Sequence, residues 1–255
     1  MTSLPVVSTV RRWAVDWLNG HDAAVCDEIM THDYELRIGE FTFTDRASYL
    51  AATSGQIALY DGLAVTVHDL VTDGRRVAVH LTEHGASTEN GGAFAVWNVV
   101  SLFEFSEDRI CRTYAEEDYH ARRRQFGDAP DAMSAPMSEP WSTAAAHPDD
   151  AATAVVTAWF EGGAVDLDAV VRDDQDVVSA YDEVMDRESG SLDIAFAAGD
   201  RVAFHGTFRG RSRPDGVACA MAAAGIVEVS GGSVVAGRMV TDRLGCLRAV
   251  RRVTR

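Results

Sequence analysis

The sequence contains no lysine, so all 23 of its positively charged side chains are arginines. A chain without a lysine amine cannot form a Schiff base with a carbonyl substrate, and it lacks the lysine of a phosphate-binding P-loop. Both of these chemistries are therefore excluded.

Cysteine is scarce, and long apolar runs are missing. The four cysteines, Cys26, Cys111, Cys219 and Cys246, are widely separated and form no CxxC pair. Such spacing favours small buried residues in a reducing compartment over a disulfide framework or a zinc site. The first residues lack the basic-then-apolar order of a signal peptide, and no apolar run is long enough to span a membrane. We therefore predict a cytoplasmic protein.

The sequence has fewer positively charged side chains than negatively charged ones, 23 against 39. The formal net charge is −16 and the pI is near 4.8. Nucleic acids and anionic membranes are bound by concentrated basic surfaces, so neither is expected as a partner. The 255 residues, 47% of them hydrophobic, are enough to bury two cores of about a hundred residues each.

One stretch of the sequence occurs twice. Residues 73–87 read DGRRVAVHLTEHGAS, residues 198–212 read AGDRVAFHGTFRGRS, and eight of the fifteen positions are identical at an offset of 125. With a one-residue gap the match continues and places Asp118 over Asp242. A chain that matches itself in this way has the signature of an internal duplication.

The duplication predicts the domain organisation. A first copy is expected at residues 1–127 and a second at 151–255. The offset between the copies is 142 at the first helix and 125 at the central strands. The second copy is therefore expected to be about 17 residues shorter in its hairpin-plus-helix region. Residues 128–150 carry four of the six prolines and are expected to form a linker. Trp141 interrupts the linker, and its large apolar ring is expected to dock on one of the domains.

Apolar spacing and turn residues predict helices first and strands afterwards in the first copy. The expected helices are 8–18, capped by Ser8, then 21–30, and 45–59, capped by Asp45, with a hairpin over 34–44 around Gly39. The expected strands are 63–72, 76–84, 93–105 and 109–117, followed by a short helix 119–126 capped by Asp118.

The second copy repeats this order in shortened form. A helix is expected to end at Phe160, and strands are expected near 192–197, 201–208, 217–229 and 233–241. Hairpin-linked strands of this length form curved antiparallel sheets. The predicted fold class is therefore α+β: two tandem cone-shaped barrels, each a curved antiparallel sheet wrapped around helices, with the second copy shortened.

Several local patterns carry a family resemblance. They are Trp13…Trp17…Asn19-Gly20-His21-Asp22, then Asp73-Gly74-Arg75-Arg76-Val77, and Asp118…Gln125-Phe126-Gly127. Together they resemble the SnoaL-like polyketide cyclase family of the nuclear transport factor 2-like superfamily. The resemblance implies a cone of curved sheet that opens at one end into a mostly apolar pocket. Members commonly pair through the sheet, so it also implies a pseudo-dimer within one chain and leaves a further homodimer open.

The resemblance does not select a reaction. The base that it implies for isomerases falls on Ile38, and the arginine and aspartate that it implies for epoxide hydrolases fall on His84 and Ala86. The second aspartate of those hydrolases falls on Ala115, whereas the histidine of scytalone dehydratase matches His80. Fold alone does not fix function, so the candidate residues must be weighed one by one.

Imidazole and carboxyl groups near the end of the cone are the candidate catalytic groups. His80, Thr82 and His84 share one face of a strand because strand side chains alternate. The last strand offers Thr113 and Glu117 on one face and Tyr114 on the other. Proton transfer is assigned to His80, His84 and Glu117, and a hydrogen bond to a developing enolate is assigned to Tyr114 or Thr82.

Aromatic side chains are the candidate substrate-binding walls. Trp13, Trp17 and Trp97, together with Thr82 and Thr113, are expected to surround a flat apolar ligand. No metal and no cofactor are expected.

The choice of strand face stays open at this stage. Hydrophobicity places Val77, Val79 and Leu81 inside, whereas the register implied by the family turns His80 and His84 towards the cavity. A third possibility is that the histidines lie where the two copies pack sheet to sheet, with His80 opposed by His205.

Two functions are compatible with these observations. The first is an enzyme that moves a proton on an apolar, carbonyl-bearing ring compound, as a cyclase, isomerase or dehydratase. The second is a module of the same fold that binds a hydrophobic ligand or a partner without catalysis. The second copy carries Arg209 and Arg211 in place of His84 and Ala86, so it is expected to be a structural partner.

Overall fold

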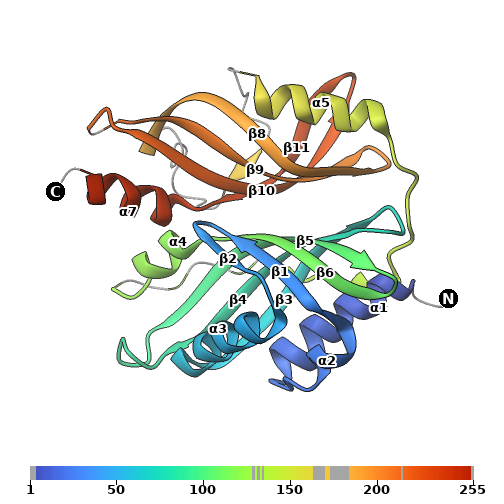
Figure 1. Ribbon diagram of the computed structural model, residues 1–255, viewed down its shortest axis with the longest axis vertical. Coiled ribbons are helices and arrows are strands. Elements are labelled where there is room, and N and C mark those ends of the chain that lie inside the picture. Colours follow the sequence, from blue (N-terminus) through green and yellow to red (C-terminus); the bar gives the residue numbers. More distant parts are fainter. Residues whose placement is uncertain are drawn as a thin grey trace.

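The computed structural model describes residues 4–127, 130, 133, 135–162, 170–172, 184–213 and 215–253. Two curved sheets lie face to face, and most of the helices cover the face of each sheet that points away from the other sheet, which we call its inner face (Figure 1). The predicted α+β class, with one sheet for each half of the chain, is confirmed.

The first half contains a six-stranded sheet and the helices that cover it. Its helical elements are α1 (Pro5–Arg12), the π-helical segment η1 (Trp13–Asn19), α2 (Val25–Ile29), α3 (Arg46–Leu59) and α4 (Tyr119–Arg124). Its strands are β1 (Met30–Ile38), β2 (Phe41–Phe43), β3 (Tyr60–Thr72), β4 (Val77–Ser87), β5 (Phe94–Ser106) and β6 (Arg109–Glu117). The strand order is β2-β1-β6-β5-β4-β3.

One strand pair departs from the predicted antiparallel sheet. β1 joins β6 in parallel, whereas the other described pairs of this sheet are antiparallel. The sequence between β1 and β6 contains the whole β2–β5 region, so this pairing is set by closure of the curved sheet and not by a hairpin.

Two of the three predicted caps of the first half are confirmed. Asp45 accepts a hydrogen bond from the Ser48 N–H at 2.8 Å, and Asp118 accepts one from the Ala121 N–H at 2.8 Å. The expectation for Ser8 is wrong, because the first helix already begins at Pro5. The fixed φ of proline and its missing N–H suit the first turn of a helix.

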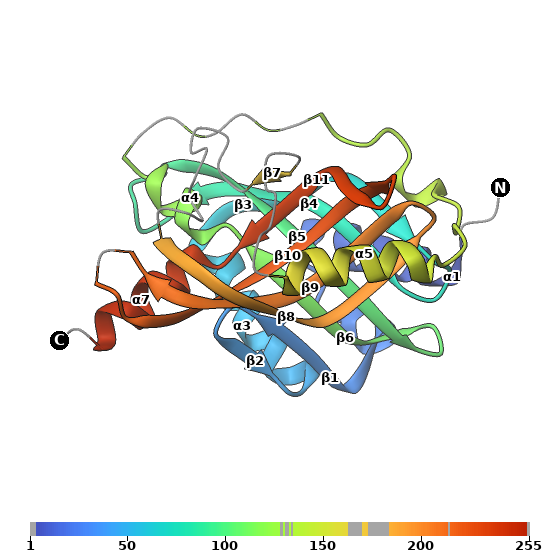
Figure 2. The same ribbon diagram turned by 90° about the horizontal axis from the view of Figure 1, so that it is seen from above.

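The second half contains a five-stranded sheet. Its elements are α5 (Asp150–Glu161), β7 (Val171–Arg172), β8 (Met185–Ala198), β9 (Arg201–Ser212), β10 (Ala218–Ser230), β11 (Ser233–Thr241) and α7 (Arg243–Val253). Seen from above, α5 crosses the inner, helix-covered face of this sheet (Figure 2). Most of the region predicted to be shortened, residues 163–169 and 173–183, lies outside the described residues, as do linker positions 128, 129, 131, 132 and 134.

The two sheets share a topology. In the second sheet, β7 lies parallel to β11, as β1 lies parallel to β6 in the first. A register shift lies between Val67 and Asp69 in the β3–β4 ladder, and another lies between Leu192 and Ile194 in the β8–β9 ladder. These shifts are 125 positions apart, which is the offset of the sequence repeat. The shared bulge supports a duplicated ancestor.

The linker lies along the first half of the chain. The predicted docking of Trp141 is confirmed: it lies in the short 3₁₀ helix η2 (Pro140–Ser142) and packs against the core of the first half. The Met137 N–H also donates to the Val67 carbonyl at 3.0 Å.

Small and aliphatic side chains fill the space between the two sheets. This interface is a separate apolar cluster, made of alternate residues from strands of both halves. Its members include Ala78, Val100 and Leu102 from the first sheet and Ala203, Ala224 and Ile226 from the second. Because each of these strands is covered on both faces, both sets of alternating side chains are removed from water.

A buried histidine joins the two sheets. His205 on β9 lies 3.0 Å from Glu116 on β6 through Nε2 and 2.8 Å from Asp193 on β8 through Nδ1. Burial alone would lower the pKa of His205, but the hydrogen bonds to Asp193 and Glu116 raise it to about 9. The imidazolium therefore donates to both carboxyl groups at neutral pH.

None of the described helices combines the length and the apolar character needed to cross a membrane.

We predict that this interface weakens in mild alkali. The His205 pKa is about 9 in the folded protein against an ordinary 6.5, so its contribution is complete below pH 6.5 and disappears as the pH rises through 9. The contribution is at most about 3 kcal/mol. Urea unfolding of the wild type and of His205→Gln across this range measures it, and the gap between the two proteins narrows as the pH rises. A gap that stays constant with pH would contradict the assignment.

Candidate functional site

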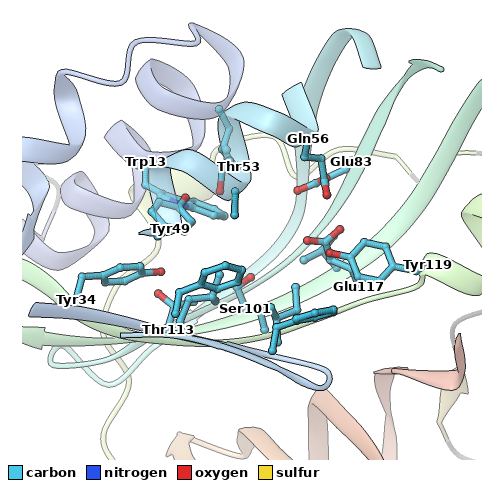
Figure 3. Close-up of a pocket in the computed structure, with 18 residues that line it drawn as sticks. Trp13, Tyr34, Tyr49, Thr53, Gln56, Glu83, Ser101, Thr113, Glu117 and Tyr119 are labelled. Carbon is cyan, nitrogen blue, oxygen red and sulfur yellow. The ribbon is translucent and has the colours of Figure 1, made fainter. Parts of the chain in front are cut away.

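A cavity of about 240 Å³ lies between α3, η1 and the inner face of the first sheet. Most of its lining side chains are apolar, and the polar ones gather towards its two ends (Figure 3). The lining consists of Trp13, Leu18, Tyr34, Leu36, Ile38, Phe41, Phe43, Tyr49, Ala52, Thr53, Gln56, Glu83, Val99, Ser101, Thr113, Ala115, Glu117 and Tyr119.

Strand alternation selects which side chains reach the cavity. On β6 these are Thr113, Ala115 and Glu117, and on β5 they are Val99 and Ser101. The two strands pair Val99 with Glu117 and Ser101 with Ala115, so these side chains share the inner face. On β4 the same face carries the apolar residues Val77, Val79 and Leu81 and then ends in Glu83.

Two buried carboxyl groups lie at one end of the cavity. Glu83 and Glu117 are 8% and 9% exposed, and they approach each other across β5 (Figure 3). Gln56 Nε2 donates to Glu83 at 2.9 Å, and Trp97 Nε1 donates to Glu117 at 3.0 Å. The amide and the indole therefore fix the two carboxyl groups in place from opposite sides.

Burial and mutual repulsion raise the pKa of this pair. The pKa of Glu83 lies well above its ordinary value because the group is buried and because the negative charge of Glu117 is close. Burial also raises the pKa of Glu117, although Arg122 and the hydrogen bond from Trp97 oppose the rise. Two carboxyl groups this close together are more stable with one proton on the pair than with both groups ionised. The Trp97 indole and the Tyr119 hydroxyl both hydrogen-bond Glu117, and these bonds favour the charged form of that group.

The helix α4 supplies further groups at this end. Tyr119 lines the cavity and hydrogen-bonds Glu117. The Arg122 guanidinium lies 5.0 Å from the centre of the Trp97 ring and 4.3 Å from that of Tyr119. A cation held between aromatic faces adds positive potential beside the carboxyl pair without entering the cavity.

Phenol groups mark the other end of the cavity. The Tyr49 hydroxyl accepts hydrogen bonds from Trp13 Nε1 at 3.1 Å and Trp17 Nε1 at 3.0 Å. Tyr34 lies edge-on to Tyr49, with ring centres 5.0 Å apart. Burial raises the pKa of both phenols. Both hydroxyls therefore stay protonated, and the Tyr34 hydroxyl can hydrogen-bond a polar group of a ligand.

Some of the predicted site residues meet here. Glu117, Trp13 and Thr113 line the cavity. Trp17 and Trp97 lie one layer behind its surface, where their indole groups hold Tyr49 and Glu117. Both tryptophans therefore orient the residues of the wall without forming it.

The predicted histidines lie on the other side of the sheet, which corrects the expectation that they share the cavity floor. His80 is buried and hydrogen-bonds Asn98 at 2.9 Å; burial and the nearby Arg238 lower its pKa to about 3. His84 lies 3.2 Å from the Thr66 hydroxyl. The apolar alternation of β4 turned Val79 and Leu81 inward, so the even-numbered side chains had to face the second half of the chain.

The same reason places Thr82 and Tyr114 outside the cavity. Thr82 hydrogen-bonds His68 at 2.9 Å. Tyr114 packs in the interface, where its ring centre lies 5.2 Å from that of His205. Neither side chain can reach a molecule bound in the cavity.

The sequence reasoning missed Glu83, Gln56, Tyr34, Tyr49 and Tyr119. A signal was present for Glu83, because it continues the apolar stripe of Val77, Val79 and Leu81. A carboxylate at the end of a buried stripe is a candidate functional group. No comparable signal marks Gln56 or Tyr49, because their positions depend on how α3 lies across the sheet.

Comparison with known protein families finds a match to part of the chain. Residues 10–113 match the family described as the SnoaL-like domain. No curated protein matches the chain.

Solved structures with a similar fold cover about half of the chain. A candidate SnoaL-like polyketide cyclase from Jannaschia sp. CCS1 is 19% identical over 51% of this chain and 95% of its own, with a TM-score of 0.46. IdmH, a candidate polyketide cyclase from Streptomyces antibioticus, is 17% identical over 48% of this chain and 98% of its own, with a TM-score of 0.44. An epoxide hydrolase-like protein from M. tuberculosis is 16% identical over 49% of this chain and 86% of its own, with a TM-score of 0.42.

We predict that removing one carboxyl group of the pair lowers the pKa of the other. In Glu117→Gln the like charge is gone, so Glu83 titrates at a lower pH than in the wild type. Side-chain ¹³C NMR of labelled glutamate follows this titration, with Glu104→Gln as the control for removal of a carboxylate elsewhere on the sheet. An unchanged Glu83 titration in Glu117→Gln would show that the two groups do not interact.

Proposed function

We propose that the first half of the chain, in which residues 10–113 match the SnoaL-like domain, is a small-molecule enzyme that transfers a proton on a carbonyl-bearing ring compound. The observation that carries the proposal is the pair of buried carboxyl groups, Glu83 and Glu117, at one end of an apolar cavity. Convergent acid and base groups in an enclosed pocket distinguish an enzyme from a simple binding module.

The two carboxyl groups take different roles. Glu117 is the base, because Arg122 and the Trp97 indole stabilise its charged form. It accepts a proton from the carbon next to the substrate carbonyl. Glu83 is the acid, because burial and the charge of Glu117 keep it protonated. It donates a hydrogen bond or a proton to the oxygen on which negative charge develops.

The rest of the cavity sets the kind of substrate. The apolar walls suit a flat, apolar ring system; they are formed by Leu36, Ile38, Phe43 and Val99. Tyr34, at the far end, hydrogen-bonds a second polar group on the same compound. Loss of a proton beside a carbonyl is a step common to ring closure, double-bond migration and elimination of water, so the site suits a cyclase, an isomerase or a dehydratase.

The second half of the chain has a structural role in this proposal, with domain limits at 1–127 and 151–255 and a linker at 128–150. The inner face of the second sheet packs against Phe160 of α5, whose ring stacks on Phe208 at 4.2 Å and contacts Phe204 at 5.3 Å. Phe208 stands at the repeat position of Glu83, 125 residues further along the chain, so an aromatic ring replaces one carboxyl group of the pair.

A deuterium-exchange assay tests the proposal. 2-Tetralone, a two-ring ketone with exchangeable protons beside its carbonyl, is incubated in D₂O with the enzyme and followed by ¹H NMR. We expect wild-type protein to accelerate exchange and Glu117→Gln to lose about 10²–10⁴-fold of that rate, the usual contribution of a general base. The pH at which the rate reaches half its maximum lies above the ordinary glutamate pKa, because the base must be ionised and its pKa is raised.

The matched control is Glu104→Gln, which removes an outward-facing carboxylate that pairs with Arg112. It is expected to keep the wild-type rate. Full activity of Glu117→Gln combined with loss of activity in His84→Gln would instead support the histidine hypothesis. Saturable binding of 2-tetralone without exchange would support the non-catalytic binding module.

A further inference from the structure

Three consecutive residues at the end of β6 point in alternating directions. Glu117 faces the cavity, whereas Glu116 and Asp118 both contact the second half of the chain. Glu116 lies 3.0 Å from His205, and Asp118 lies 2.8 Å from Arg243. The candidate base is therefore flanked on both sides by residues that the second half holds.

The pair formed by Asp118 and Arg243 is almost completely removed from water. The side chains are 0% and 2% exposed, and Arg243 Nη2 lies 2.8 Å from each carboxylate oxygen of Asp118. Asp118 also accepts the Ala121 N–H as the cap of α4. The same carboxylate thus binds the start of α4 and the first residue of α7. The two helices lie next to each other in Figure 1.

The orientation of α4 matters for the carboxyl pair. This short helix carries Tyr119, which hydrogen-bonds Glu117, and Arg122, whose charge acts on both Glu83 and Glu117. A helix of six residues has little stability of its own, so its position depends on its cap and its packing. Asp118 supplies the cap, and Arg243 fixes Asp118.

From this geometry we infer that Arg243 of the second half is a positioning residue for the site of the first half. By binding Asp118 it fixes the start of α4, and through α4 it fixes Tyr119 and Arg122 beside Glu83 and Glu117. The inference rests on the proposed function of the cavity, and it gives the second half a defined role in that function.

The pairing also predicts what a substitution does. Arg243→Met leaves the Asp118 carboxylate buried without its cation, which is a strongly unfavourable arrangement. The start of α4 then moves towards solvent and carries Arg122 away from the carboxyl pair. Arg243→Lys keeps a cation at the position and is expected to retain part of the effect.

A spectroscopic readout tests this without any turnover. Trp97 Nε1 donates to Glu117, so the indole ¹H–¹⁵N signal of Trp97 reports the ionisation of that carboxyl group. The signal is assigned with Trp97→Phe. In Arg243→Met the midpoint of the Trp97 titration is expected to move to higher pH, because the charge of Arg122 no longer favours the ionised pair. Arg243→Lys is expected to give an intermediate midpoint.

Arg252→Met is the matched control. Arg252 is also on α7 and also pairs across the two halves, with Glu40 at 2.8 Å, but its side chain is 62% exposed and its partner lies in the turn between β1 and β2. It is expected to leave the Trp97 titration unchanged.

In the 2-tetralone exchange assay, Arg243→Met is expected to lower kcat about tenfold with little change in KM, because the acid and base groups are displaced while the apolar walls are kept.

The outcomes separate the two proposals. A folded Arg243→Met protein with the wild-type Trp97 titration would overturn the positioning role, whatever its activity. Absence of exchange in the wild type would defeat the proposed reaction, while the Trp97 titration would still decide the role of Arg243. If Arg243→Met does not fold, Asp118→Asn gives the decision, because asparagine keeps an oxygen for the Ala121 N–H and loses the charge that Arg243 binds.

Discussion

The structure depends on one constraint: the strands β4, β5 and β6 are buried on both faces. Helices cover the inner face, and the second sheet covers the outer face. Alternation of side chains then sends each buried residue of these strands to one of two environments. Polar groups on the inner face can act on a molecule in the cavity, whereas polar groups on the outer face bind other residues of the same sheet or the second half of the chain.

This constraint explains what could be predicted from the sequence. Local patterns were sufficient for the hairpins and for the helix caps at Asp45 and Asp118, because these depend on neighbouring residues. The repeat at an offset of 125 could be found by comparing the sequence with itself. The site depends on which face encloses space. Both faces of β4 are buried, so the sequence alone did not show which face lines the cavity. His80 has the type of side chain expected in an active site, but it lies in the interface. Glu83 continues a stripe of core residues, but it lines the cavity.

The buried carboxyl pair is unfavourable for folding, and the surrounding residues limit that cost. Gln56, Trp97 and Tyr119 hydrogen-bond the two groups, and Arg122 supplies a compensating charge. A shared proton removes the remaining repulsion. An apolar pair of similar volume would fill the same space without these partners, so the arrangement is more readily explained by proton transfer than by stability.

The two halves carry different residues at some positions that are equivalent in the sequence repeat. Asp118 and Asp242 both accept a backbone N–H at the start of a helix, from Ala121 and Gly245. The residue after each aspartate differs: Tyr119 turns into the cavity, whereas Arg243 crosses the interface to bind Asp118. A homodimer of identical copies would carry the same residue at both places. Fusion into one chain therefore lets one copy keep the phenol at the site while the other provides the guanidinium that holds that site in position.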